Sequence, residues 1–180
     1  QALDALATMY PQSYKTTLRK MLQGGRVTVN RQVEKDAKRL LLAGDTRAST
    51  EVLASWLGGS FSACGGHVTW AGVLPTPAVS WLLRGSEFTA GVVISASHNP
   101  ATDNGIKVLA PTGEKLSEGA ELALEALVAT VRPAAGAALP PPATDLADRY
   151  LDLLVSSHDR EGPLAGLAVV VDTANGAASE

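Results

Sequence analysis

The chain of 180 residues contains one cysteine and few aromatic side chains, which make up 4% of it. A single cysteine excludes an internal disulfide, and Cys64, which lies among small residues, is expected to be a structural thiol. His67 and His158 have no companions at metal-ligand spacing. No apolar run approaches the roughly 18 residues of a membrane-spanning helix, and nothing resembles a signal peptide. We therefore expect a cytoplasmic protein with no membrane partner.

The charges are distributed unevenly along the chain. Residues 1–41 hold eight Lys or Arg against three acids, a formal +5, whereas residues 42–180 carry a formal −8, so that the overall charge is −3. An apolar content of 46% with 18% charged residues is typical of a soluble globular domain. The composition thus predicts a folded core with a basic segment before it.

The most informative stretch is a polar loop that follows a short apolar strand. Residues 90–94 (A-G-V-V-I) predict a strand, and S-A-S-H-N-P at 95–100 and N-G-I-K at 104–107 follow it. Loops at the carboxyl ends of strands surround ligand sites in α/β folds. Phosphoryl transfer needs an oxygen nucleophile, balancing cations and a base, which Ser97, a metal ion and Lys107 could supply. The simpler alternative is a polar loop with a turn proline.

The loop S-A-S-H-N-P with D-N-G-I-K at 103–107 resembles the active-site loop of the α-D-phosphohexomutases. The resemblance implies that Ser97 carries a phosphoryl group, that Lys107 is the general acid/base and that His98 assists proton movement. It also implies Mg²⁺ as cofactor, with Ser97 as a ligand through its phosphate. The substrate would be a hexose or hexosamine phosphate, and the hexapeptide favours glucosamine phosphates over those of glucose and mannose.

Two further motifs support the same family. Residues 45–49 (D-T-R-A-S) resemble its G-R-D-T-R segment, and residues 74–78 (L-P-T-P-A) resemble its V-P-T-P-A turn. We expect both motifs to be structural rather than catalytic. In the second, Thr76 is a plausible N-cap and Pro77 suits the first helical position.

The alternation of strands and helices predicts an α/β fold, namely an α/β/α sandwich with a mixed sheet. The expected elements after the loop are a strand at 106–109, a turn at 111–114, a helix capped by Ser117 and ended by Arg132-Pro133, a linker at 133–142, a helix capped by Thr144 and a buried strand at 167–172. Leu124, Leu127, Val128 and Val131 share one face of the first helix, and Leu146, Tyr150, Leu153 and Leu154 form the buried side of the second. The resemblance makes residues 43–160 the first phosphohexomutase domain and residues 161–180 the start of the second.

Residues 1–42 predict a small basic α+β segment instead. A helix at 13–22, a stop at 24–25 and a strand at 26–30 resemble an S-four-type RNA-binding module, whose basic hairpin would contact RNA phosphates. The alternative is a solvated basic face, and Arg31 stands where the module has glycine in its turn. Residues 42–45 (L-A-G-D) fit either the end of this module or a G-R-D in which Gly44 replaces arginine.

Several family segments are absent from the 180 residues. These are the D-x-D-x-D run that binds magnesium, the G-E-x-S-G-H segment that reads the sugar and the R-x-S-G-T-type loop that holds its phosphate. In the family they lie on later domains. We therefore expect this chain to carry the phosphoserine loop without completing the mutase reaction by itself.

Overall fold

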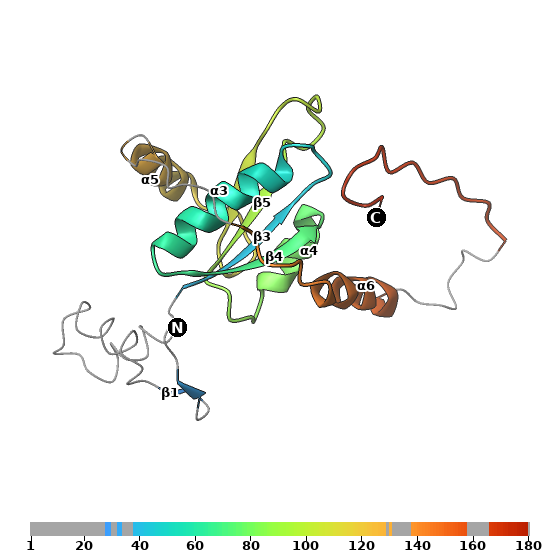
Figure 1. The fold of residues 1–180 in the computed structure, drawn as a ribbon. Helices are drawn as coiled ribbons and strands as arrows, with labels where there is room; N and C mark the ends of the chain where they lie inside the picture. Colours follow the sequence, from blue (N-terminus) through green and yellow to red (C-terminus); the bar gives the residue numbers. More distant parts are fainter. Residues whose placement is uncertain are drawn as a thin grey trace.

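A mixed sheet forms the centre of the fold, with its strands in the order β4, β3, β5, β6. The computed structural model describes residues 28–29, 32–33, 38–128, 130, 138–157 and 166–179. The strands are β3 (Arg39–Gly44), β4 (His67–Val73), β5 (Ala90–Ile94) and β6 (Ile106–Leu109). β3 runs parallel to both β4 and β5 (Figure 1). β6 runs antiparallel to β5. The two strands predicted around the polar loop, at 90–94 and 106–109, are thus confirmed.

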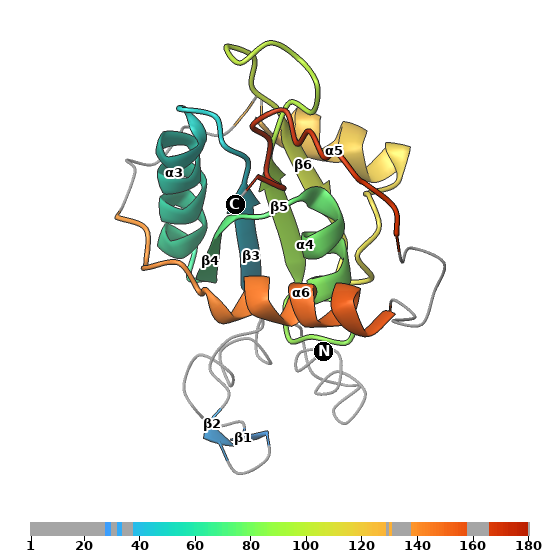
Figure 2. The same ribbon diagram turned by 90° about the vertical axis from the view of Figure 1, so that its right-hand side faces the viewer.

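β3 is apolar because both of its faces are covered. Its alternate residues enter two cores: Leu41 joins the core beneath α4 (Thr76–Leu83), and Leu42 joins the core beneath α3 (Thr50–Ala63). Both leucines are fully buried. The two helices therefore cover opposite faces of the sheet (Figure 2), which confirms the predicted α/β/α sandwich with a mixed sheet.

α6 (Asp145–Ser157) adds to the α4 side of the sheet. Leu146 is buried in the same core as α4, and the ring of Tyr150 lies 6.3 Å from that of Trp81 between ring centres. The buried side predicted for this helix is only partly buried, because Leu154 remains 45% exposed. The aromatic contact joins α6 to α4.

The predicted helix starts are confirmed for two helices and wrong by one residue for the third. α6 starts directly after Thr144, and α5 (Glu118–Val128) starts directly after Ser117, whose hydroxyl and carbonyl oxygens both accept amides of the first turn. In α4 the N-cap is Pro75 rather than Thr76. The carbonyl of Pro75 accepts the first amides of the helix, so Thr76 is already helical.

α5 exposes its apolar side, since Leu127 and Val128 are 60% and 68% exposed. Val131 and the predicted stop at 132–133 lie outside the described residues, as does the linker up to residue 137. Residues 138–142 form neither helix nor strand, as predicted for a linker, and Leu139 packs against the core beneath α3.

The turn predicted at 111–114 is confirmed and joins the end of β6 to α4. Gly113 has a φ of +81° and donates its amide to Ala110. A Cβ at Gly113 would lie 2.1 Å from the carbonyl oxygen of Ser80, whose hydroxyl donates to the Gly113 carbonyl. The position therefore requires glycine both for its left-handed backbone and for its close approach to α4.

The buried strand predicted at 167–172 is wrong. The structure has no strand there, and Val170 and Val171 are 97% and 76% exposed. Among the described residues no strand pairs with this segment, so its backbone has no ladder and its valines have no core to enter. The turn after it does make one contact with the sandwich, because Thr46 Oγ1 donates to the carbonyl of Asn175 at 2.6 Å.

Little of the basic segment at 1–42 lies in the described part of the chain. The hairpin expected there is present as β1 (Thr28–Val29) paired antiparallel with β2 (Gln32–Val33). The expected helix at 13–22 and its stop lie outside the described residues. Among the helices that are described, none has the length and apolar character needed to cross a membrane.

Candidate active site

The polar loop connects β5, an inner strand of the sheet, to the edge strand β6 and is closed at its base. Its first amide, that of Ser95, donates to the carbonyl of Gly105 at 2.9 Å, so the loop begins and ends side by side at the carboxyl end of β5. A Cβ at Gly105 would lie only 2.7 Å from the carbonyl oxygen of Ser95. Glycine at 105 therefore lets the two ends of the loop meet.

Ser97 lies at the exposed tip of this arrangement in a left-handed backbone conformation, with a φ of 58°. A positive φ is uncommon outside glycine and often marks a functional position. The Ser97 amide donates to Ser95 Oγ at 3.1 Å, and the Asn99 amide donates to the Ala96 carbonyl at 3.2 Å. The hydroxyl predicted to carry the phosphoryl group is thus accessible on an ordered turn.

Arg47, in the loop between β3 and α3, donates hydrogen bonds to the backbone of the polar loop. Its Nε donates to Asp45 Oδ2 at 3.0 Å. Its two terminal nitrogens donate to four carbonyl oxygens of the polar loop, those of Ser97, Asn99, Pro100 and Asp103. The Arg47 side chain is only 8% exposed.

Asp45 is the anion at the centre of these contacts. Its carboxylate also accepts the Arg47 amide at 3.2 Å and the Thr50 hydroxyl at 3.3 Å. Burial by itself would raise the pKa of Asp45, but hydrogen bonds from the Ser95 hydroxyl and from Arg47, with the charge of Arg47, outweigh it and lower the pKa below its ordinary value. Asp45 is therefore ionised at neutral pH.

A second contact joins the start of α3 to the far side of the polar loop. Ser49 Oγ donates to the side-chain oxygen of Asn104. Within the loop itself, Asn99 donates its side-chain amide to the Asp103 carboxylate at 3.3 Å. Ser49 is the N-cap residue of α3 but makes no side-chain cap bond there. Its hydroxyl serves the loop instead.

The structure brings Ser97 and His98 together on the exposed tip and places Lys107 beyond the base of the loop. Lys107 is half-buried on β6 and pairs with Val93, which belongs to the core beneath α4. The Lys107 side chain therefore projects from the same face of the sheet, the face that α4 covers. The catalytic roles of these three residues stay predictions. The role of Arg47 as a ligand of the loop backbone was missed, although its place beside Asp45 after a buried strand was visible in the sequence.

The described residues do not by themselves fit a magnesium site. Among them, no group of three or more His, Cys, Asp and Glu side chains could hold a metal ion. Ser97, through a phosphate, is the one ligand that the sequence predicts.

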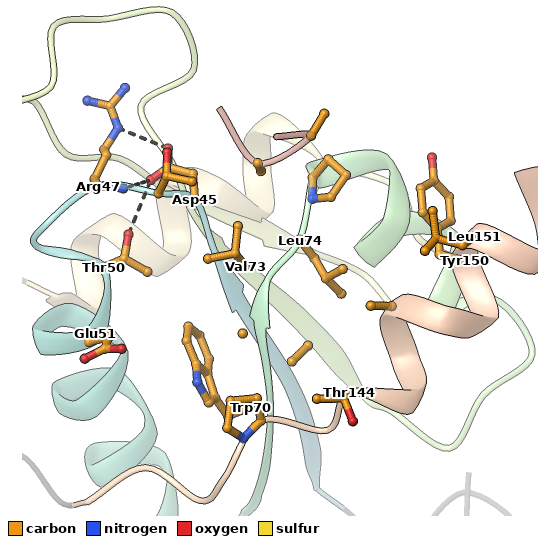
Figure 3. A pocket seen from close by; sticks show the side chains of 18 of the residues that line it. Asp45, Arg47, Thr50, Glu51, Trp70, Val73, Leu74, Thr144, Tyr150 and Leu151 are labelled. Carbon is orange, nitrogen blue, oxygen red and sulfur yellow. Dashed lines mark hydrogen bonds and ion pairs between the residues drawn. The ribbon is translucent and has the colours of Figure 1, made fainter. Parts of the chain in front are cut away.

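A groove of about 920 Å³ opens beside this site at the carboxyl ends of β3 and β4 (Figure 3). The Asp45 and Arg47 side chains form one end of it, and Leu74, Tyr150 and Leu151 form the other. Ser97, His98 and Lys107 do not line it. The groove therefore borders the network that holds the loop, without containing the predicted nucleophile.

Comparisons with known proteins agree with this geometry. Residues 15–134 match the family model described as phosphoglucomutase/phosphomannomutase, alpha/beta/alpha domain I. The chain is 45% identical over 141 residues to the phosphoglucosamine mutase of Alkalilimnicola ehrlichii (77% of this chain, 31% of that protein). It is 46% identical over 150 residues to that of Rhodococcus erythropolis (80% and 33%). The chain thus spans about a third of these relatives.

The solved structures give the same picture. A putative phosphomannomutase from Thermus thermophilus superposes with a TM-score of 0.60 at 27% sequence identity, over 78% of this chain and 31% of that one. The family match starts at residue 15 and so includes much of the segment that resembles an RNA-binding module. The proteins named here lend no support to an RNA contact.

Proposed function

This chain belongs to the phosphoglucomutase/phosphomannomutase family, and from that membership we propose that it is the first domain of a phosphoglucosamine mutase, which interconverts glucosamine 6-phosphate and glucosamine 1-phosphate. The observation that carries the proposal is the exposed, left-handed Ser97 on a loop held at the carboxyl end of β5. The choice of sugar follows the names of the relatives. Phosphoglucomutase or phosphomannomutase activity is the alternative.

In the proposed reaction Ser97 Oγ bears the phosphoryl group. A hydroxyl of the bound sugar phosphate attacks the phosphorus, so that a new oxygen–phosphorus bond forms on the sugar while the bond to Ser97 Oγ breaks. Lys107 is the proposed acceptor of the hydroxyl proton, and His98 is the proposed donor to Ser97 Oγ. The other phosphate of the resulting sugar bisphosphate then returns to Ser97 by the reverse steps.

The proposed cofactor is Mg²⁺. A phosphoserine holds about −1.5 to −2 charges at neutral pH, and a dication bound to its oxygens would reduce that charge. Since the described residues offer no complete site, further ligands would come from elsewhere in the protein. A cytoplasmic location is part of the proposal, because the one thiol, Cys64, has no cysteine partner in the sequence.

A chimaeric enzyme tests the proposal. This chain would replace the matching third of the Alkalilimnicola ehrlichii phosphoglucosamine mutase, and conversion of glucosamine 6-phosphate would be measured together with the phosphorylation site by mass spectrometry. We expect turnover and a phosphate on Ser97, both lost in Ser97→Ala. Thr102→Ala, another exposed hydroxyl of the same loop, is the matched control and should stay active. A folded chimaera that turns over equally well with Ser97→Ala would exclude the assignment.

The basic segment supports a second, independent candidate function. Its formal charge of +5 and the hairpin of β1 and β2 suit contact with RNA phosphates. If residues 1–42 bind RNA, the affinity of the whole chain for RNA should fall steeply as salt is raised. A filter-binding titration at two salt concentrations measures this, and no binding even at low salt would remove the candidate.

A further inference from the structure

We propose that Asp45 and Arg47 are positioning residues that hold Ser97 in its left-handed conformation, and that Arg47 does so instead of binding substrate phosphate. The catalytic consequence rests on the proposed function. The conformational claim rests on the contacts alone, and the two can fail separately.

Every donor of Arg47 is already engaged within the chain. A guanidinium has five N–H groups, and here Nε donates to Asp45 while the two terminal nitrogens donate to four loop carbonyls. An arginine near a phosphoserine would ordinarily be taken for a phosphate ligand, because its fork suits phosphate oxygens. To bind phosphate, Arg47 would have to release the backbone of the loop that carries Ser97.

Hydrogen bonds hold the Ser97 backbone on both sides of its Cα. On one side, the Ser97 carbonyl accepts Arg47 at 3.0 Å, and Arg47 donates through Nε to Asp45. On the other side, the Ser97 amide donates to the hydroxyl oxygen of Ser95, two residues before it in the same loop. The peptide group after the Ser97 Cα is therefore held by Asp45 through Arg47, and the peptide group before it is held within the loop by Ser95.

The bonds to the Ser97 amide and carbonyl restrict rotation about φ and ψ, the two torsions that would have to change for Ser97 to leave the left-handed region. Because an L-residue is strained at positive φ, Ser97 needs continuous support from outside its own turn. The two charged side chains of this support are largely shielded from water, since Arg47 and Asp45 are 8% and 13% exposed. Charge-assisted hydrogen bonds are stronger in such surroundings than in water.

Lysine cannot replace this set of contacts. Its ammonium carries the same charge but has three donors at a single point, so it cannot reach a carboxylate and four carbonyl oxygens at once. A role that depended on positive charge alone would survive Arg47→Lys, whereas positioning by a fork would not.

Amide hydrogen exchange of the full chain measures the order of the loop. The amides of Ser97, Asn99 and Asp103 are hydrogen-bonded within it and serve as reporters. We expect Arg47→Lys to raise their exchange rates at least tenfold while the β5 amides change little. The control is Arg39→Lys, an arginine at the opposite end of β3 that pairs with an exposed carboxylate, and it should leave the reporters unchanged. Reporters that exchange at the wild-type rate in Arg47→Lys would overturn the proposal.

The wild-type chain supplies a measurement that needs no variant. The Nε–H resonance of Arg47 should be protected from solvent and should not move when inorganic phosphate is titrated. A saturating shift of that resonance would show that Arg47 binds phosphate and would overturn the proposal, even if the variants failed to fold. Loss of loop order in Arg47→Lys together with absence of phosphate on Ser97 in the chimaera would support positioning and exclude the mutase.

Discussion

Gly44 and Thr50 form a pair in which one residue supplies the space that the other fills. Gly44 ends β3 with a φ outside the left-handed region, so its backbone does not itself require glycine. A Cβ built there would lie 2.1 Å from Thr50 Cγ2. Thr50 cannot easily turn aside, because it is only 3% exposed and its hydroxyl donates to Asp45. Gly44→Ala therefore forces a methyl group against a fixed one.

The expected cost is that of overpacking a core, about 1–3 kcal/mol. For a domain of this size each kcal/mol lowers Tm by about 2–4 °C, so Gly44→Ala should lower Tm by about 2–12 °C. Thr50→Ser removes Cγ2 but keeps the hydroxyl on Asp45. In that background the new Cβ meets only atoms about 3.4 Å away, and Gly44→Ala should be nearly neutral.

Urea unfolding of the four proteins in this cycle gives the coupling between positions 44 and 50. We expect a coupling of about 1–3 kcal/mol in favour of the double variant. An equal cost of Gly44→Ala in the wild-type chain and in the Thr50→Ser variant would refute the steric reasoning.

Three further predictions concern other parts of the fold. The pKa of Asp45 is lowered in the folded chain. The ionised carboxylate therefore stabilises the fold above the ordinary pKa of 3.8, and this stabilisation is lost as the pH falls through the lower folded pKa. In urea unfolding measured against pH, Asp45→Asn should make the loss of stability at acid pH less steep. Gly105→Ala places a Cβ 2.7 Å from the carbonyl oxygen of Ser95, a backbone atom that cannot move aside, and should cost about 1–3 kcal/mol of unfolding free energy in the same assay. Gly119→Ala lies on exposed α5 with open space around it and should instead stabilise the fold by about 0.5–1 kcal/mol. Leu83→Ala should cost about 2–5 kcal/mol, because Leu83, the last residue of α4, is fully buried. Leu122→Ala, at a position 60% exposed, should change the free energy of unfolding by less than about 0.5 kcal/mol.

The local signals of the sequence were sufficient to predict the strands on either side of the polar loop. β5 and β6 have the predicted bounds because each is a short β-branched or aliphatic run that small polar or turn residues end on both sides. The mixed sheet followed from strands that alternate with helices. These features depend on neighbours in the sequence, and the sequence contains them.

The segment at 167–172 shows where such signals stop being sufficient. Its run of valines is as strand-like as β5, but a strand also needs a partner, and no strand among the described residues pairs with it. The role of Arg47 was hidden for a similar reason. The charge of Arg47 was visible in the sequence, but its hydrogen-bond acceptors are carbonyl oxygens about 50 residues further along the chain.

The contacts of Arg47 depend on the pairing of β3 with β5, and this gives the loop its order. Gly44 lies opposite Ile94 in the parallel register, and the next amide, that of Asp45, donates to the Ile94 carbonyl at 3.0 Å. The hydrogen bonding of the sheet therefore continues one bond beyond the end of β3 and reaches Ile94, the residue directly before Ser95. Beyond this bond, the Arg47 side chain of the β3–α3 loop donates to carbonyl oxygens of the polar loop, that of Ser97 among them. Since these contacts require that distant strands pair, the family motif alone does not hold Ser97 in place, and changes at the end of β3 should alter the order of the backbone at Ser97.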